Sequence, residues 1–150
     1  MSNDDIIDTL NDLIETSKDG EYGFRTSADY MRDTAIKHRF TARAEECRQA
    51  AAELQQLVAR FGGSAEDSGS AAGALHRGWV AVKGTLAGYT DKAILEETEE
   101  GEDTALASYR TALDEDLPPE ARAVIERQYE GVKRNHLEVR TLRDQARAVS

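Results

Sequence analysis

Residues 13–21 read Leu-Ile-Glu-Thr-Ser-Lys-Asp-Gly-Glu, and residues 94–102 read Ile-Leu-Glu-Glu-Thr-Glu-Glu-Gly-Glu. When the two stretches are aligned, Glu21 meets Glu102 and each glutamate follows a glycine. Both stretches lie in segments with helical spacing of apolar residues, so each glycine falls inside a predicted helix. Glycine there costs about 1 kcal/mol relative to alanine. We interpret the matched glycines as positions of close helix packing beside an inward-facing carboxylate.

Four long apolar stripes extend outward from these stretches. They predict helices over about 3–33, 34–61, 91–115 and 119–147, with a crossover at 62–90. Gly62-Gly63 is typical of a helix end with a left-handed cap, and Pro118-Pro119 suits the first turn of a new helix. A break of the first helix near Asp19–Gly20 is the alternative to one continuous helix.

The lengths of the connections predict the topology. Helices joined by short connections form antiparallel hairpins, whereas the long crossover returns the chain along the bundle. The expected fold is therefore a single all-α domain over residues 1–150, a ferritin-like up-down-down-up four-helix bundle. The crossover is expected to carry a short extra helix at 74–87, with Leu75, Trp79, Val82 and Leu86 on one face.

The composition excludes several classes of protein. The chain has 150 residues, a formal charge of −10 and 39% apolar residues, which fits one domain with a core. A net negative charge disfavours nucleic acids and anionic membranes as partners. Cys47 is the only cysteine, so no intrachain disulfide forms. With no signal-like or membrane-spanning apolar run, we expect a cytoplasmic protein.

The sequence resembles an uncharacterised bacterial family of ferritin-like four-helix-bundle proteins with no assigned activity. The resemblance rests on five stretches, of which the crossover stretch is the most specific: 10–15, 18–21, 68–79, 99–103 and 116–119. They span nearly the whole chain. The resemblance implies the fold strongly and the function only weakly.

Ferritin-like di-iron proteins place one glutamate on each of two helices and a Glu-x-x-His motif on each of the others. Glu21 and Glu102 match the first pair, and His136 lies near their predicted level. The two Glu-x-x-His motifs are absent. We expect a core layer of Glu21, Glu102, Cys47 and His136, with Arg43 leaning in, and no complete di-iron centre.

Each of these residues has a structural alternative. Glu21 and Glu102 face solvent if their helices are rotated, His136 becomes a satisfied boundary histidine, and Cys47 becomes a small core residue. The glutamates at 96–102 are then mainly a solvated face. No nucleophile motif or phosphate-binding loop is present, so no catalytic residues and no organic cofactor are expected.

Three hypotheses about function follow. The first is a non-enzymatic ferritin-like bundle, stress-associated or partner-binding, with a degenerate di-metal site and no bound cofactor. The alternative is a metal-binding protein that uses Glu21, Glu102 and His136 to hold iron, zinc or manganese, in metal handling or oxidation. The third is a small-molecule or lipid binder.

The crossover also predicts assembly. Its apolar face exceeds what one flank of a four-helix core readily covers, and such patches mark self-association. We expect a homodimer, the alternative being a monomer in which Trp79 folds onto the bundle.

Overall fold

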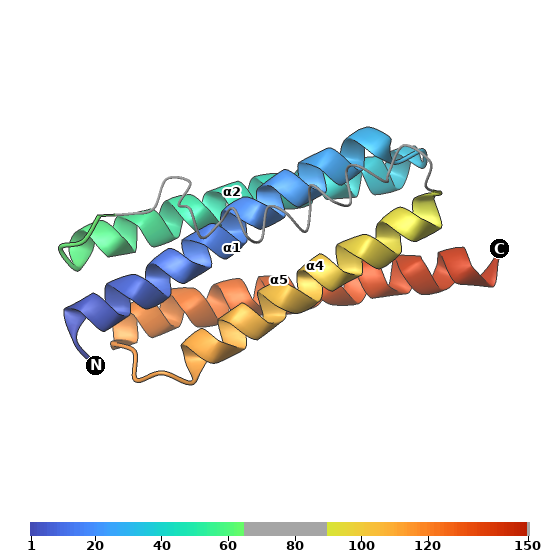
Figure 1. Ribbon diagram of the computed structural model, residues 1–150. Coiled ribbons are helices and arrows are strands. Elements are labelled where there is room, and N and C mark those ends of the chain that lie inside the picture. Colours follow the sequence, from blue (N-terminus) through green and yellow to red (C-terminus); the bar gives the residue numbers. More distant parts are fainter. Residues whose placement is uncertain (65–89, 150) are drawn as a thin grey trace.

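The computed structural model describes residues 1–64 and 90–149, which form four α-helices and no strand within those ranges. The helices are α1 (Asn3–Tyr30), α2 (Thr34–Arg60), α4 (Asp91–Leu113) and α5 (Pro119–Ala148). Figure 1 shows them as a bundle of two hairpins lying side by side, α1 with α2 and α4 with α5. The all-α four-helix bundle predicted from the sequence is confirmed.

The helix boundaries agree with the apolar stripes to within a turn. The first helix ends at Tyr30 rather than near residue 33, and α4 ends at Leu113 rather than near 115. α1 continues without a break through Asp19 and Gly20. The short helix expected at 74–87, including Trp79, lies outside the described residues.

Local sequence accounts for the helix ends. Ser2 and Asp5 form a reciprocal capping box at the start of α1. Gly62, just after α2, has a φ of +83°, so the predicted left-handed glycine is confirmed. Proline opens α5, where its missing N–H costs nothing. These signals act within a few residues, which is why they could be recognised before the tertiary structure.

Asp91 ties the start of α4 to the turn between α1 and α2. Its carboxylate accepts hydrogen bonds from the backbone N–H groups of Arg32 at 2.8 Å and Asp33 at 2.9 Å. A carboxylate held by two backbone donors is a strong, charge-assisted contact. This contact fixes the position of the first turn of α4, and thus of the α4–α5 hairpin, relative to the α1–α2 hairpin.

The core consists of two apolar clusters along the bundle. One cluster gathers at the N-terminal end of α1 around Leu10, Leu54 and Ile125, and the other gathers around Phe24, Phe40 and Leu95. Glu102 falls between the clusters on α4, because Leu95 belongs to one cluster and Leu106 to the other. The middle of the bundle is therefore a polar layer between two apolar halves.

The two hairpins meet differently on their two sides. α1 packs directly against α4, whereas the backbones of α2 and α5 approach closely at few points. Polar side chains bridge α2 and α5 instead: Arg39–Glu138, Glu53–Arg127 and Arg60–Glu120 form ion pairs across this seam. This seam is the side of the bundle where α2 faces α5. Polar side chains that lie in it can contact the polar layer in the middle of the bundle.

Two helical glycines differ in their surroundings, and this gives a test of the close-packing interpretation. A Cβ at Gly20 would lie 3.0 Å from Cys47 Sγ, whereas a Cβ at Gly131 would meet only Arg134 Nη2 at 3.6 Å. We expect Gly131→Ala to raise the free energy of unfolding by about 0.5–1 kcal/mol, because alanine favours the helix. We expect Gly20→Ala to gain less or to destabilise, because the cysteine sulfur must move.

Urea denaturation of the two variants measures the difference. The matched control is Gly20→Ala combined with Cys47→Ala, in which the stabilisation should return relative to Cys47→Ala alone. A full alanine gain at Gly20 in the wild-type background would contradict close packing at this position.

Candidate functional site: the buried polar layer

Glu102 is the centre of the polar layer. Its residue is 2% exposed, and its Oε1 accepts a hydrogen bond from Asn135 Nδ2 on α5 at 2.5 Å. Arg43 Nε on α2 lies 3.5 Å from the same oxygen. Three helices thus contribute one side chain each to this cluster. The other oxygen, Oε2, is buried and has no hydrogen-bond partner among the described residues.

Arg43 is held by more than its ion pair with Glu102. Its Nη1 lies 3.7 Å from the exposed carboxylate of Glu46, one turn along α2, and its guanidinium lies over the ring of Phe24, 5.9 Å from the ring centroid. Burial lowers the pKa of Arg43, but Coulombic interactions with the ionisable groups around it, Cys47 and then Glu102 and Glu46, produce a net rise. Arg43 therefore stays a cation in the core.

A second set of hydrogen bonds continues the layer toward α5. The buried Tyr109 hydroxyl donates to Gln128 Oε1 at 2.7 Å. Gln128 Nε2 then donates to Glu53 Oε1 at 2.9 Å and to the carbonyl of Ala50 at 3.3 Å. Gln128 thus reaches across the seam and spans the gap between α5 and α2. Because each partner is fixed by another, the layer is a polar network rather than a set of independent contacts.

Burial dominates the protonation behaviour of this layer. Desolvation raises the pKa of the Glu102 carboxyl, and the nearby Arg43, Asn135 and His136 only partly oppose that rise. Burial also raises the pKa of the Cys47 thiol and of Tyr109, each to about 12. Cys47 is therefore a neutral thiol at physiological pH, which does not favour a nucleophilic role.

A cavity of about 850 Å³ adjoins the network. Its lining includes Arg43, Cys47 and Glu102 from the buried layer, and Glu46 and Arg134 from the exposed edges of α2 and α5. The lining mixes aromatic, aliphatic and charged groups. The polar layer is therefore adjacent to space large enough for several waters or a small molecule.

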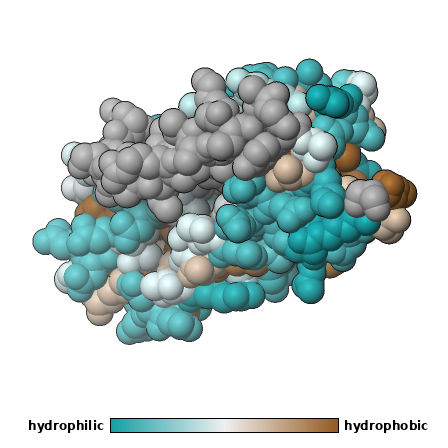
Figure 2. All heavy atoms as spheres, turned by 45° about the vertical axis from the view of Figure 1, so that its right-hand side comes forward, coloured by the Kyte–Doolittle hydropathy of each residue, from teal (hydrophilic) through white to brown (hydrophobic). Residues whose placement is uncertain are grey.

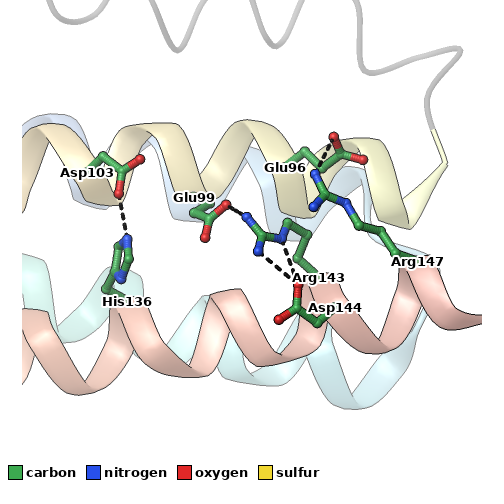
Figure 3. Close-up of polar contacts among 7 residues, drawn as sticks. All are labelled: Glu96, Glu99, Asp103, His136, Arg143, Asp144 and Arg147. Carbon is green, nitrogen blue, oxygen red and sulfur yellow. Dashed lines mark hydrogen bonds and ion pairs between the residues drawn. The ribbon is translucent and has the colours of Figure 1, made fainter.

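The residues predicted as metal ligands have separate partners. Glu21 has a side chain 27% exposed and pairs within α1 with Arg25, at 3.0 Å. His136 Nε2 lies 2.6 Å from Asp103 Oδ1 (Figure 3). Glu102 alone is fully buried, with the partners described above. Arg43 and Cys47, expected in the same layer, are both buried there.

Part of the glutamate-rich stretch also has partners on α5. Figure 3 shows Arg143 between Glu99 and Asp144, and Arg147 reaching Glu96. The Glu99–Arg143 pair is the most shielded of these, with side chains 13% and 15% exposed. These contacts join α4 to α5, so carboxylates of this stretch stabilise the packing of α4 against α5 within their hairpin.

The fit to a di-metal centre can be judged from these partners. Within residues 1–64 and 90–149, no three His, Cys, Asp or Glu side chains gather as a metal-binding group. A di-iron centre of the ferritin-like type needs four carboxylates and two histidines. The buried cation beside Glu102 is a guanidinium, which repels a second cation at close range. The described donor set does not fit that centre.

Sequence reasoning missed Asn135 and the Tyr109–Gln128–Glu53 chain. Tyr109 and Gln128 both lie on predicted apolar stripes, and a polar residue on such a stripe is a usable signal for a buried partner. Asn135 lies beside His136, off the stripe, and had no comparable signal.

No described helix has the length and apolar character that crossing a membrane requires.

Comparisons with known proteins agree with this fold. A family model described as "Domain of unknown function (DUF2383)" matches residues 5–115. A solved structure of a Dps1 mutant from Mycobacterium smegmatis superimposes with a TM-score of 0.76 at 16% sequence identity, covering 94% of this chain and 96% of that one. No curated protein matches the sequence. At this identity the structural likeness shows a shared ferritin-like fold.

The raised pKa of Glu102 predicts a pH dependence of stability. A carboxyl whose pKa is higher in the folded state binds its proton more tightly there than in the unfolded chain. Its contribution is thus fully present below the ordinary glutamate pKa of 4.5 and is lost as the pH rises through the folded-state value. We expect the wild type to lose stability relative to Glu102→Gln above this pH, by at most about 1.4 kcal/mol per pH unit.

Urea denaturation of both proteins between pH 4 and pH 8 measures this difference, with Glu45→Gln as the control. Glu45 has the opposite shift, because the side chain of Arg48 hydrogen-bonds it and lowers its pKa. The stability difference for Glu45→Gln should therefore change with pH in the opposite sense. A difference for Glu102→Gln that grows in favour of the wild type as pH rises would contradict the raised pKa.

Proposed function

The chain belongs to the family described as DUF2383, and from that premise we propose that it is a non-enzymatic ferritin-like bundle that binds a partner. In this proposal an internal guanidinium occupies the part of the core where related bundles hold metal. The observation that carries the proposal is the Arg43–Glu102 contact, in which a fixed cation engages the one fully buried glutamate of the layer.

The chemistry of the layer supports this choice. Arg43 remains charged at any physiological pH, and its guanidinium offers donors but no electron pair for a metal. Cys47 is held as a neutral thiol by burial. Tyr109 is hydrogen-bonded to Gln128. These features favour a fixed structural layer rather than a reaction centre.

Metal handling through Glu21, Glu102 and His136 is the second candidate. One observation favours it: Glu102 Oε2 is a buried carboxylate oxygen without a hydrogen-bond partner among the described residues. Such an atom accepts a proton, a water or a cation. Iron, zinc and manganese are the metals to test, since all three accept carboxylate and imidazole ligands.

Metal analysis separates the two candidates. Protein purified without chelators is incubated with iron, zinc or manganese, desalted and analysed by mass spectrometry for metal content. The proposal predicts far less than one equivalent of metal per chain, because no set of ligands among the described residues would hold the ion through desalting. Glu102→Gln and His136→Ala serve as controls. One equivalent of metal that both substitutions abolish would establish the second candidate instead.

We propose that one partner is a second copy of this chain. The described residues expose few large apolar side chains, namely Met1, Leu137 and Val149. Figure 2 shows a mainly hydrophilic face with small hydrophobic patches. We therefore place the interface of the proposed homodimer at the sequence 74–87, whose spacing predicts an apolar face.

Light scattering at micromolar concentration tests this assembly. We expect a mass of about two chains, reduced by Trp79→Ala while the helical circular dichroism stays unchanged. Leu137→Ser is the control, because this exposed residue lies outside the proposed interface and its loss should leave the mass unaltered. A wild-type monomer, or a dimer that depends on Leu137 instead of Trp79, would contradict the proposed interface.

A further inference from the structure

A ladder of opposite charges crosses the seam between α2 and α5. Glu53 and Arg60 on α2 pair with Arg127 and Glu120 on α5. Along each helix the two residues lie two turns apart, and the helices are antiparallel, so each pair forms one rung of the ladder. A third rung, Arg39–Glu138 at 3.1 Å, lies toward the other end.

One rung of this ladder is open. Two turns before Glu53 the chain has Glu46, and two turns after Arg127 it has Arg134. The antiparallel register therefore places Glu46 and Arg134 at the same level with complementary charges. In the structure Glu46 turns along its own helix to Arg43, at 3.7 Å. Arg134 has no ion-pair or hydrogen-bond partner among the described residues.

The open rung lies over the cavity beside the polar layer. Glu46 and Arg134 both line that cavity, and both are exposed. Next to them Gly131 has no side chain, and among the described residues a Cβ there would meet only Arg134 Nη2, 3.6 Å away. Cys47 lines the same cavity and is 5% exposed. At Gly131 the seam therefore carries no side chain beside the cavity.

We propose that Glu46 and Arg134 form a gate between solvent and this cavity. When Glu46 pairs with Arg43, as in this structure, Arg134 is left without Glu46 as its partner, and small molecules enter the cavity beside Gly131. With Glu46 on Arg134, the fourth rung forms and narrows the α2–α5 side of the cavity mouth, whose lining also includes the exposed residues Glu100 and Thr104 of α4. Arg43 keeps its ion pair with Glu102 in both states. The movement of Glu46 from Arg43 to Arg134 therefore leaves no buried charge unpaired.

The energetics permit exchange between the two states. Glu46 has a side chain 59% exposed, and its 3.7 Å contact with Arg43 is long for an ion pair. Pairing with Arg134 is a surface interaction of similar modest strength. Two weak, mutually exclusive partners make both states populated, and a loss of either charge should shift the population by about twofold to fivefold.

Cys47 reports on the entrance, because it is the only cysteine in the chain and lies in the cavity. The measurement is the rate at which methyl methanethiosulfonate modifies Cys47, followed by mass spectrometry at fixed pH. We expect Arg134→Gln to raise that rate about twofold to fivefold. Arg134→Lys should keep the wild-type rate, because lysine retains the cation that pairs with Glu46.

Arg60→Gln is the matched control, because it removes an exposed rung away from the cavity and should leave the rate unchanged. The dependence of the rate on urea distinguishes local opening, with a small slope, from global unfolding, with the full slope of the protein. The proposal is overturned if Arg134→Gln leaves the rate unchanged or lower, if Arg60→Gln raises it equally, or if wild-type modification follows global unfolding.

Discussion

A guanidinium and a carboxylate, both shielded from water, sit where the two apolar clusters of the bundle meet. Removing either charge from water costs several kcal/mol, and the attraction between them offsets that cost only while further hydrogen bonds hold the geometry. Asn135 provides such a bond to Glu102, and Glu46 and the ring of Phe24 support Arg43. Helices α2, α4 and α5 must therefore keep a fixed rotation about their axes for the centre to stay satisfied.

This constraint explains why the two hairpins meet unequally. Where α1 faces α4, side chains such as Leu10 and Leu106 allow direct packing. Where α2 faces α5, the backbones approach closely at few points, and ion pairs and the amide of Gln128 bridge the seam. A wider seam lowers the apolar contact between the hairpins, and the polar bridges replace part of it. The cavity beside the layer follows from the same separation.

A ferritin-like fold and its usual metal chemistry are separable properties. The fold depends on apolar stripes, short hairpin turns and a long crossover, all of which tolerate exchange of polar core residues. Metal chemistry depends on a set of ligands within a few ångströms. Here the arrangement around Glu102 combines an arginine and an asparagine with a carboxylate, so the architecture is retained while the centre contains a different kind of contact.

The sequence by itself determined the helices, their ends and their order, because these depend on spacing and on contacts within a few residues. It also indicated that Glu102, Cys47 and Arg43 share one level, since helical rise converts residue number into height. The height of a residue along the bundle does not give the direction in which its side chain points around the helix axis. Glu21 pairs with Arg25 on its own helix, and His136 meets Asp103 rather than a glutamate across the core. Only the tertiary structure decided these partners, because a side chain's neighbours depend on how far each helix turns about its axis, and that angle is set by the packing of all four helices together.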